Sequence, residues 1–313
     1  MRMHSLSVVA LSNRTYSSLA EKLEEAVAWL EIAAGQGAEL TVLPEGLNQI
    51  LGDGVAGRSS ARAEAEVCDH WQRDMEPLIR AAVRLKVWAT IPVVHRQGDG
   101  IRNSFFLISP EGEAVWQCDK LSPTPSELDA GILPGAPSFY QWKGITLGGA
   151  ICFDTCFPEN LDVQARHGVE LLLVPTLWPG GTQLQTFCKL HASRAAVSYP
   201  HWSRIIDVDG EEVVAGGYRN ETLRFGFGTP VYTAAINFDR LSLFGNGNQE
   251  QMAEIQRKYG GRVRVTFDQG NCLWFLESRD QDLQEREILR EFGLVTATEY
   301  FAGCARKIRE RTP

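Results

Sequence analysis

The sequence of 313 residues has no long hydrophobic run and no excess of basic residues. No stretch approaches the roughly 20 apolar residues that a membrane-spanning helix needs, and Leu6–Leu11 is too short for the core of a secretory signal. We therefore expect a cytoplasmic protein that makes no use of a membrane. The 31 Lys and Arg residues are outnumbered by 39 Asp and Glu, which gives a net charge of -8. This balance argues against nucleic acid as a partner, because its binding depends on basic side chains that neutralise phosphates.

The sequence also lacks the cysteine pattern of a disulfide framework. Its seven cysteines are an odd number and lie far apart, except for Cys152 and Cys156. No nearby pair of His or Cys completes a zinc set, and the six histidines show no metal-ligand spacing. The GxSxG nucleophile elbow and the GxxxxGK[ST] phosphate loop are absent as well. The pattern therefore favours neither zinc, serine-nucleophile nor nucleotide chemistry.

Strand-like and helix-like segments alternate along the first hundred residues. Short apolar runs at Leu6–Leu11, Leu40–Leu43 and Val87–Val94 are typical of buried strands. Apolar residues recur at helical spacing in Leu19–Ala34, and a second helix is expected near Trp71–Leu85. This βαβαβ order with short connections predicts an α/β layered structure.

The alternation continues through the rest of the chain. A turn sequence at Ser109–Glu113 separates two apolar runs, Asn103–Ile108 and Ala114–Trp116, and predicts a hairpin. We expect further strands at Ile145–Phe153, Leu171–Pro175, Trp202–Val208 and Pro230–Ile236, and helices at Asn160–His167 and Leu184–Val197. A mixed sheet layered by helices fits this order better than two unrelated domains. We expect one catalytic domain over residues 1–280.

The charged segment that begins at Asp280 predicts a C-terminal helix. Asp280 or Asp282 would cap its start and Gly293 would end it. Its apolar residues form only a partial stripe. Residues 281–313 are thus expected to form a helical tail that either packs on its own domain or makes a subunit contact.

Two candidate catalytic groups follow predicted strands in the first half of the chain. Glu45 comes directly after the strand that Pro44 closes, and partial burial there would raise the pKa of its carboxyl group toward that of a useful base. Lys120 precedes the proline-rich segment Ser122–Glu127, which is stiff enough to hold Lys120 and Glu127 in a fixed relation. Taken alone, such a glutamate is more often a solvated loop residue or a helix cap, and such a lysine lies on the surface.

The third candidate is Cys152, near the end of the predicted strand Ile145–Phe153. A thiol at a bend before a helix is exposed and lies near helical N–H groups, which would stabilise its thiolate. The alternative is a buried structural cysteine. A Cys–His pair also stays open, because such partners meet only in the fold, but no histidine follows a strand as closely as Glu45 does.

Taken together, these segments resemble the nitrilase superfamily, the carbon–nitrogen hydrolases with a Glu–Lys–Cys triad. The resemblance covers roughly residues 5–200, and the order and intervals of the motifs agree with it. Four pieces of sequence carry it: Ala33–Leu40 running into Leu43–Glu45, Asn103-Ser104 with Ser109–Gly112, Ile151–Asp154, and Phe157–Glu159.

The resemblance implies a four-layer αββα sandwich of two mixed sheets flanked by helices, with no metal and no organic cofactor. It also implies that subunits pair, so a homodimer or a higher homo-oligomer is expected. By the same resemblance Cys152 would be the nucleophile, Glu45 the general base, and Lys120 the group that stabilises developing charge. Glu127 falls where many members carry a second glutamate that positions the substrate or the lysine.

The resemblance also indicates residues that would contact substrate. The backbone N–H of Phe153 and the Lys120 ammonium fit the donors that a tetrahedral oxyanion needs. Thr176 and Trp178 occupy positions that commonly face substrate in relatives, although Trp178 would equally suit the core. The chain departs from the family pattern at Asp119, where many members have Arg, and after Arg194-Ala195, where Glu-Asn is common.

Local sequence gives two opposing indications about the substrate. Phe153-Asp154 after the cysteine is typical of amidases and carbamoylases, whereas Lys120–Thr124 with Glu127 is similar to the lysine loop of nitrilases. We expect hydrolysis of a small amide or N-carbamoyl compound through a thioester, which releases ammonia or an amine and a carboxylic acid. The first alternative is a nitrilase that works through a thioimidate. The second is an acyl transferase or a catalytically degenerate binding protein.

Overall fold

Two six-stranded mixed sheets form the centre of the molecule. The computed structural model describes residues 1–11, 16–49, 67–217, 230–245 and 247–312. The first sheet has the order β12-β1-β2-β3-β4-β5, and the second has the order β11-β10-β9-β8-β7-β6. In the first sheet the strands are β1 (Met3–Val9), β2 (Leu40–Val42), β3 (Trp88–Gln97), β4 (Gly100–Ile108), β5 (Ala114–Asp119) and β12 (Val231–Asn237). In the second they are β6 (Tyr140–Trp142), β7 (Ile145–Gly149), β8 (Leu171–Pro175), β9 (Arg194–Ser198), β10 (Ser203–Ile206) and β11 (Glu212–Gly216).

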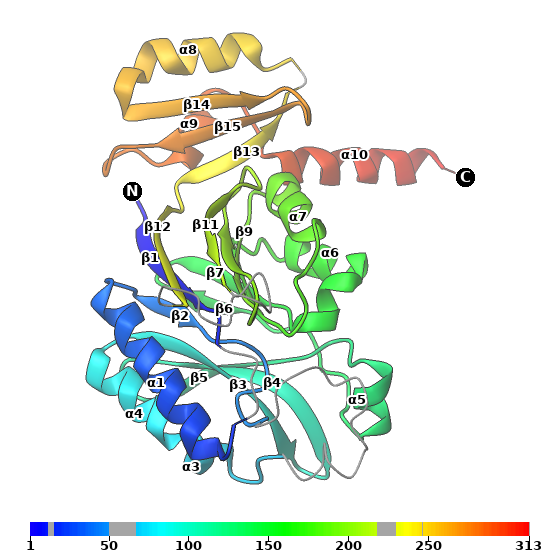
Figure 1. Ribbon diagram of the computed structural model, residues 1–313. Helices are drawn as coiled ribbons and strands as arrows, with labels where there is room; N and C mark the ends of the chain where they lie inside the picture. The colour runs from blue at the N-terminus through cyan, green and yellow to red at the C-terminus, as the bar shows by residue number, and fades with distance from the viewer. Residues whose placement is uncertain (12–15, 50–66, 218–229, 246, 313) are drawn as a thin grey trace.

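Helices cover the outer face of each sheet (Figure 1). The helices beside the first sheet are α1 (Leu19–Gly35), α3 (Trp71–Asp74) and α4 (Glu76–Leu85). Those beside the second are α6 (Pro158–Arg166) and α7 (Gln183–His191). Two short helices lie in loops, α5 (Pro125–Asp129) and the 3-10 helix η1 (Cys152–Cys156).

Three apolar cores separate these four layers. Along β4, Phe106 and Ile108 belong to the core under α1 and α4, while Phe105 and Leu107 belong to the core between the two sheets. This alternation follows from the two-residue period of a strand. Because both faces of β4 are covered, residues 105–108 are all apolar. A third core lies between the second sheet and α6 and α7. The αββα sandwich and the α/β class expected from the sequence are confirmed.

Most of the expected elements are present with bounds that differ by a few residues, but two of them were extended over residues that form another element. The helix expected over Leu184–Val197 is wrong in its second half: α7 ends at His191, and Arg194–Ser198 is strand β9. Ala192 has a positive φ of 52°, which ends the helix. The next residues then pair with β8, so tertiary pairing overrides the helical preference of Arg and Ala. Likewise the strand expected over Ile145–Phe153 ends at Gly149.

A smaller unit follows the sandwich. Strands β13 (Arg240–Phe244), β14 (Val263–Asp268) and β15 (Leu273–Ser278) form a three-stranded antiparallel sheet covered by α8 (Gln249–Tyr259), with a 3-10 turn η3 (Gly260–Arg262) before β14. Helix α9 (Glu285–Glu291) shares the core of this sheet through Ile288 and Leu289. The division of the chain at residue 280 stays a prediction.

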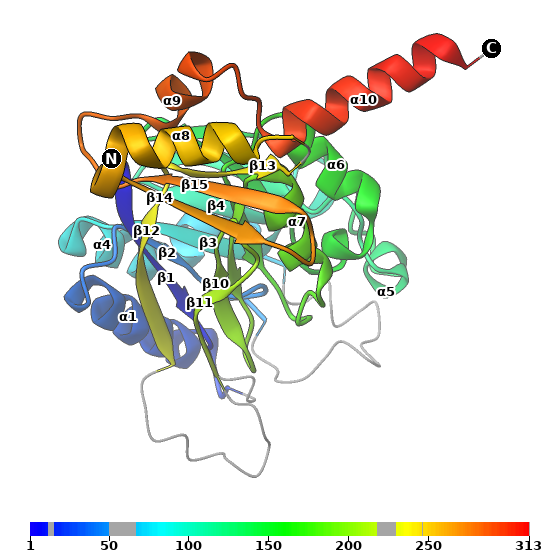
Figure 2. The same ribbon diagram turned by 90° about the horizontal axis from the view of Figure 1, so that it is seen from above.

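The C-terminal helix α10 (Ala297–Arg311) extends away from the rest of the molecule (Figure 2). The sequence predicted one tail helix over residues 280–293, whereas the structure has α9 and then this longer helix. Only its first turns contact the body, where the rings of Tyr300 and Phe301 pack on Phe244. Thr296 and Glu299 form a capping box at its start, which explains why it begins there.

Candidate active site

The candidate catalytic residues follow strands of both sheets. Glu45 lies beyond β2, Lys120 directly follows β5, and Cys152 begins η1 beyond β7. Strands β2 and β5 run in the same direction, because β2 is parallel to β3 and two antiparallel pairings separate β3 from β5. Their carboxyl ends therefore lie at the same edge of the first sheet, where ligands of α/β proteins commonly bind.

Glu45 is almost fully buried, with 7% of its surface exposed. Its Oε1 accepts hydrogen bonds from Lys120 Nζ at 3.1 Å and from Asn103 Nδ2 at 2.8 Å. Its Oε2 accepts one from the backbone N–H of Leu177 at 3.0 Å. Each oxygen of this carboxylate therefore has a donor from a different part of the chain.

The loop that carries Glu45 is held by a lysine of α1. The buried Lys22 donates through Nζ to the backbone oxygens of Gly46 at 2.8 Å and Gln49 at 2.6 Å. Gly46 has a φ of +72°, a conformation that glycine adopts at little cost. The sharp turn at Gly46 and the Lys22 contacts together place the Glu45 carboxylate at the edge of the sheet.

Glu127 reaches the same cluster from the start of α5. Thr124 caps this helix: its side chain accepts from Glu127 N, and Glu127 Oε2 accepts from Thr124 N at 2.7 Å. The other oxygen, Oε1, accepts from Lys120 Nζ at 2.9 Å and from Asn103 Nδ2 at 2.8 Å. The segment between Lys120 and Glu127 thus holds the two side chains together, as its prolines led us to expect.

Charge interactions in this cluster overcome the cost of burial. Burial lowers the pKa of Lys120, but attraction to the surrounding acidic groups, Glu45 foremost, outweighs it and raises the pKa above its usual value. For Glu127 burial raises the pKa, whereas Lys120 and the hydrogen bonds to the carboxylate lower it, and the net result is a lowered pKa. Lys120 and Glu127 are therefore an ionised pair at neutral pH.

Cys152 is half-buried beside this cluster and has a φ of 50°, in the left-handed region. Burial raises the pKa of its thiol, the charge of Glu45 raises it further, and Lys120 acts in the opposite direction. The net pKa lies above the usual value, which is contrary to the thiolate stabilisation expected from the sequence. The physical reason is that burial and the charge of Glu45 act on the thiol, while η1 separates it from the start of α6 at Pro158. The resting thiol needs a base.

Asp154 connects the cysteine turn to the lysine loop. Its side chain is fully buried, and it accepts hydrogen bonds from Ser122 N at 2.6 Å and from Ile151 N at 2.9 Å. Burial raises the pKa of Asp154 to about 6, although these hydrogen bonds and Lys120 oppose the rise. This clamp fixes the spacing between Lys120 and Cys152.

The predicted substrate-contact residues differ in their surroundings. Thr176 is fully buried at the end of β8, and its hydroxyl donates to Trp178 O at 2.6 Å and accepts from Trp178 N at 2.8 Å. Both Thr176 and the Leu177 N–H interact with the Cys152 thiol. Trp178 is 39% exposed, so the alternative of a core tryptophan is wrong. Phe153 packs edge-on against Phe157.

Sequence reasoning missed three contributors to the site: Asn103, Lys22 and the Leu177 N–H. Asn103 carried a usable signal, because asparagine is rare in the apolar interior of a strand such as β4. Lys22 carried a weaker one, since it lies among the buried residues of an amphipathic helix. A backbone donor such as Leu177 N–H leaves no signal in residue identity.

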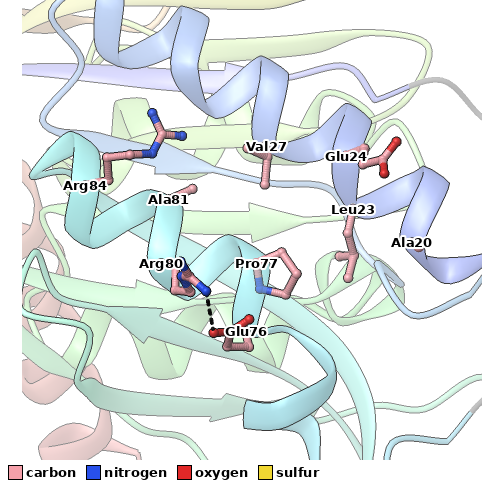
Figure 3. Close-up of a pocket in the computed structure, with 9 residues that line it drawn as sticks. All are labelled: Ala20, Leu23, Glu24, Val27, Glu76, Pro77, Arg80, Ala81 and Arg84. Carbon is pink, nitrogen blue, oxygen red and sulfur yellow. Dashed lines mark hydrogen bonds and ion pairs between the residues drawn. The ribbon is translucent and has the colours of Figure 1, made fainter.

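None of the candidate residues lines the groove between α1 and α4 (Figure 3). Apolar side chains such as Leu23 and Val27 line it together with charged ones, including the Arg80–Glu76 ion pair. Within the described ranges no group of His, Cys, Asp and Glu side chains is arranged to hold a metal ion. No helix of the described part of the chain is long and apolar enough to cross a membrane.

The fold and this thiol–carboxylate–ammonium cluster define an α/β protein with a candidate cysteine site. The family model for carbon-nitrogen hydrolases matches residues 5–243. The chain belongs to this family, within the nitrilase superfamily. The resemblance stated from the sequence motifs is confirmed.

Characterised relatives are distant. A Synechocystis protein named deaminated glutathione amidase is 27% identical over 184 residues, which are 55% of this chain and 66% of the relative. Nitrilase 2 of Arabidopsis thaliana is 26% identical over 188 residues, which are 54% of each chain. The chain thus spans less than two thirds of the length of these relatives.

Solved structures show the same fold. The amidase of Nesterenkonia sp. aligns with a TM-score of 0.59 and 19% identity, over 82% of this chain and 96% of that one. A Saccharomyces cerevisiae member of branch 10 of the nitrilase superfamily aligns with a TM-score of 0.62 and 17% identity, over 83% and 95%. One structure of a Nesterenkonia amidase variant carries the acetamide moiety of fluoroacetamide on its active-site cysteine.

Proposed function

We propose that this protein is a hydrolase that cleaves the carbon–nitrogen bond of a small amide or N-carbamoyl compound through a thioester on Cys152. The observation that carries the proposal is the buried cluster of Glu45, Lys120 and Glu127 beside the half-buried thiol. A base, a cation and a nucleophile at one edge of a sheet are the groups that acyl transfer requires.

Glu45 acts as the general base. Because burial and neighbouring charge raise the pKa of the Cys152 thiol, the free thiolate is scarce at neutral pH, and attack needs a partner that accepts the proton. Glu45 is a carboxylate whose charge acts on the Cys152 thiol and whose two oxygens are both held by donors. The thiol proton passes to Glu45 while sulfur bonds to the substrate carbonyl carbon.

Lys120 and the backbone N–H of Phe153 stabilise the oxyanion of the tetrahedral intermediate. Loss of one such donor typically costs about 3 kcal/mol in transition-state stabilisation. When the intermediate collapses, the carbon–nitrogen bond breaks and Glu45 returns its proton to the leaving ammonia or amine. Glu127 positions Lys120 and takes no proton in this scheme.

Water completes the cycle. Glu45 takes a proton from a water molecule, whose oxygen bonds to the thioester carbon. The carbon–sulfur bond then breaks, the carboxylic acid leaves, and the proton on Glu45 returns to the Cys152 sulfur. Thr176 and Trp178 line the acyl side in this proposal, with Trp178 exposed enough to reach a substrate from solvent.

An amide substrate is favoured over a nitrile. Phe153-Asp154 follows the cysteine, as in amidases, and the Synechocystis relative is named an amidase. The alternative is a nitrilase reaction through a thioimidate, which the nitrilase-like lysine loop and the Arabidopsis relative support. An acyl transferase or a degenerate binding protein is the remaining alternative, and the intact cluster of Glu45, Lys120 and Cys152 argues against degeneracy.

Intact-mass measurement after brief exposure to substrates tests the proposal. A panel of small amides, N-carbamoyl compounds and nitriles is added, with ammonia release measured in parallel. We expect amide-type compounds to leave an acyl adduct on Cys152 and to release ammonia or an amine, and Cys152→Ala to abolish both. Full activity of Cys152→Ala would overturn the central claim, an adduct only from nitriles would establish the alternative, and no adduct from any compound would favour a binding protein.

The proposed partners are the small substrate and further copies of this chain, as a homodimer or a higher homo-oligomer. The exposed helix α10 is the part of the proposed tail, residues 281–313, that is best placed for such a contact, since Phe301 and Ile308 are 38% and 65% exposed. The proposed hydrolase domain spans residues 1–280, and a cytoplasmic location also stays a prediction.

A further inference from the structure

Asn103 lies at the centre of the candidate site without belonging to the expected catalytic set. It is on β4, between β3 and β5, and only 2% of it is exposed. Its backbone oxygen accepts from Lys120 N at 2.8 Å, so the sheet itself holds it opposite the lysine. Residues 105–108 that follow it in the strand are all apolar. A buried polar amide among them needs partners.

The partners of Asn103 are the two carboxylates. Its Nδ2 donates to Glu45 Oε1 and to Glu127 Oε1, both at 2.8 Å. Lys120 Nζ donates to the same two oxygens, at 3.1 Å and 2.9 Å. Each Oε1 therefore receives one hydrogen bond from a neutral amide and one from an ammonium. The amide orientation is determined, because the opposite one would set Oδ1 against two carboxylate oxygens.

The hydrogen bonds from Asn103 offset the repulsion between the two carboxylates. Two carboxylates share one ammonium, so the buried cluster carries a net negative charge, and like charges favour protonation of one partner. A neutral donor that bridges both carboxylates stabilises their ionised forms without adding charge. Glu127 has a lowered pKa, and its hydrogen bond from Asn103 is among the causes.

We propose that Asn103 is a positioning residue that holds the carboxylates of Glu45 and Glu127 together around Lys120. By fixing Oε1 of Glu45, it leaves Oε2 directed to the Leu177 N–H, which also interacts with the Cys152 thiol. The catalytic consequence rests on the proposed function, whereas the electrostatic role does not.

The titratable groups that face this cluster come from four segments. They are Glu45 after β2, Lys120 after β5, Glu127 in α5, and Cys152 and Asp154 in η1. Four of the five are acidic, so any negative charge added at position 103 makes ionisation of the Cys152 thiol harder. The acid limb of any reaction that needs the Cys152 thiolate then moves to higher pH.

Two variants separate this role from simple packing. Asn103→Asp keeps the shape of the side chain but replaces the donor with an acceptor, and Asn103→Ala removes the donor without adding charge. The probe is iodoacetamide, with the alkylation rate of Cys152 followed by peptide mass spectrometry between pH 5 and pH 10. The exposed Cys272 of the same molecules, which lies outside the site, serves as an internal standard. Thermal unfolding verifies that each variant is folded at the measurement temperature.

We expect Asn103→Asp to slow alkylation of Cys152 by about tenfold at each pH of this range, which is equivalent to moving its pH midpoint upward by about one unit. Asn103→Ala should shift it in the same direction by less. The acid limb of kcat/KM on an amide should move in parallel. A packing role predicts the reverse order, with the isosteric Asp tolerated better than Ala, and that order or an unshifted midpoint in Asn103→Asp would overturn the proposal.

Asn237→Asp is the matched control. Asn237 also donates to a carboxylate, Glu277 Oε1 at 3.3 Å, but outside the site. We expect the pH profile of Cys152 alkylation in Asn237→Asp to match that of the unmodified protein. A shift as large as that of Asn103→Asp would show a general charge effect and contradict the proposal. Alkylation needs no turnover. If no amide is hydrolysed while the midpoint still shifts, the proposed function fails and the role of Asn103 stands.

Discussion

At the scale of single residues, the site depends on buried polar side chains whose donor groups are paired with carboxylates. Lys120 is 1% exposed and Asn103 is 2% exposed, yet each has two carboxylate partners. A buried charge without a partner is costly, so removal of one member leaves the others destabilised. The cluster is therefore a unit, and the effects of substitutions within it will not add.

Asp154 makes stability depend on pH in a way that can be measured. Its pKa in the folded protein is about 6, above the ordinary value of 3.8, so the folded state binds the proton more tightly than the unfolded state does. Proton binding by Asp154 stabilises the folded state in full below pH 3.8, and this contribution is lost as the pH rises through 6. From pH 5 to pH 8 the loss amounts to about 1 to 2 kcal/mol.

Asp154→Asn removes this titration. We compare the unfolding free energy of the variant with that of the unmodified protein at each pH. We expect the variant to be about 1 to 2 kcal/mol more stable, relative to the unmodified protein, at pH 8 than at pH 5. Urea unfolding at both pH values provides the measurement. The variant also loses one acceptor of the clamp, a cost that is the same at both pH values and cancels in the comparison. A difference that stays flat with pH would show that Asp154 does not titrate in this range.

At this scale the sequence predicts residue types well and contacts poorly. Glu45, Lys120 and Cys152 were found because each follows an apolar run and because their motifs occur in the family's order. The bond between Asn103 and Glu45 joins residues 58 positions apart, and that between Leu177 and Glu45 joins residues 132 apart. No local pattern encodes such pairs, since the sheet order that brings them together depends on the whole fold.

At the scale of elements, short turns after strands set the geometry of the site. The loop after β2 turns at Gly46, and Lys22 of α1 binds its carbonyl groups. Gly37 offers a comparison, because it has a similar φ of +84° and nothing within 4 Å of where a Cβ would stand. At Gly46 a Cβ would lie 2.7 Å from the side chain of Gln49.

Gly46→Ala should therefore reduce both stability and activity, whereas Gly37→Ala should reduce stability alone. The left-handed conformation costs an alanine about 1 to 2 kcal/mol at either site. Only Gly46 adjoins Glu45. If Glu45 is the proposed general base, displacement of its carboxylate should slow the chemical step by about tenfold or more. Urea unfolding and kcat on an amide provide the two measurements. Equal kcat values for the two variants would mean that the turn at Gly46 does not position Glu45.

The predicted helices and strands agree with the structure where the apolar period of the sequence was clear. The helix α1 and strands β2 and β8 follow clear apolar periods and lie within a few residues of the expected bounds. The prediction was wrong at Arg194–Ser198, where helix-favouring residues form β9 because they pair with both β8 and β10. Pairing on two sides supplies backbone hydrogen bonds and burial that outweigh local preference.

At the scale of the whole molecule, α10 is the element with the least internal support. Arg306, Lys307, Arg309 and Arg311 give its second half a basic surface, and Ile308 is 65% exposed there. A 15-residue helix that packs on the body at its first turns draws little stability from its second half, because helices of this length are only marginally stable in water by themselves. A contact with another copy of this chain, whose net charge is -8, would supply the missing burial and suit the charge.

Removal of residues 297–313 tests this contact. We expect the truncated protein to have a lower molar mass in light scattering than the full chain at the same concentration. Amide turnover per subunit should persist, because no residue of the candidate site lies in the removed segment. As a milder version, Ile308→Glu should weaken association while the helix remains. An unchanged molar mass in both variants would place the subunit contact elsewhere or show that none exists.

The sequence by itself determined the class of the protein. Alternating apolar runs predicted the α/β layers, and three motifs in order identified the family and the candidate residues, because these properties depend on local composition and spacing. Only the tertiary structure decided which groups of the candidate site contact one another. It showed that burial raises the pKa of the Cys152 thiol, that Asn103 bridges two carboxylates, and that Leu177 supplies a backbone donor. Burial and long-range hydrogen bonds are set by the packing of distant strands, so they exist only once the chain has folded.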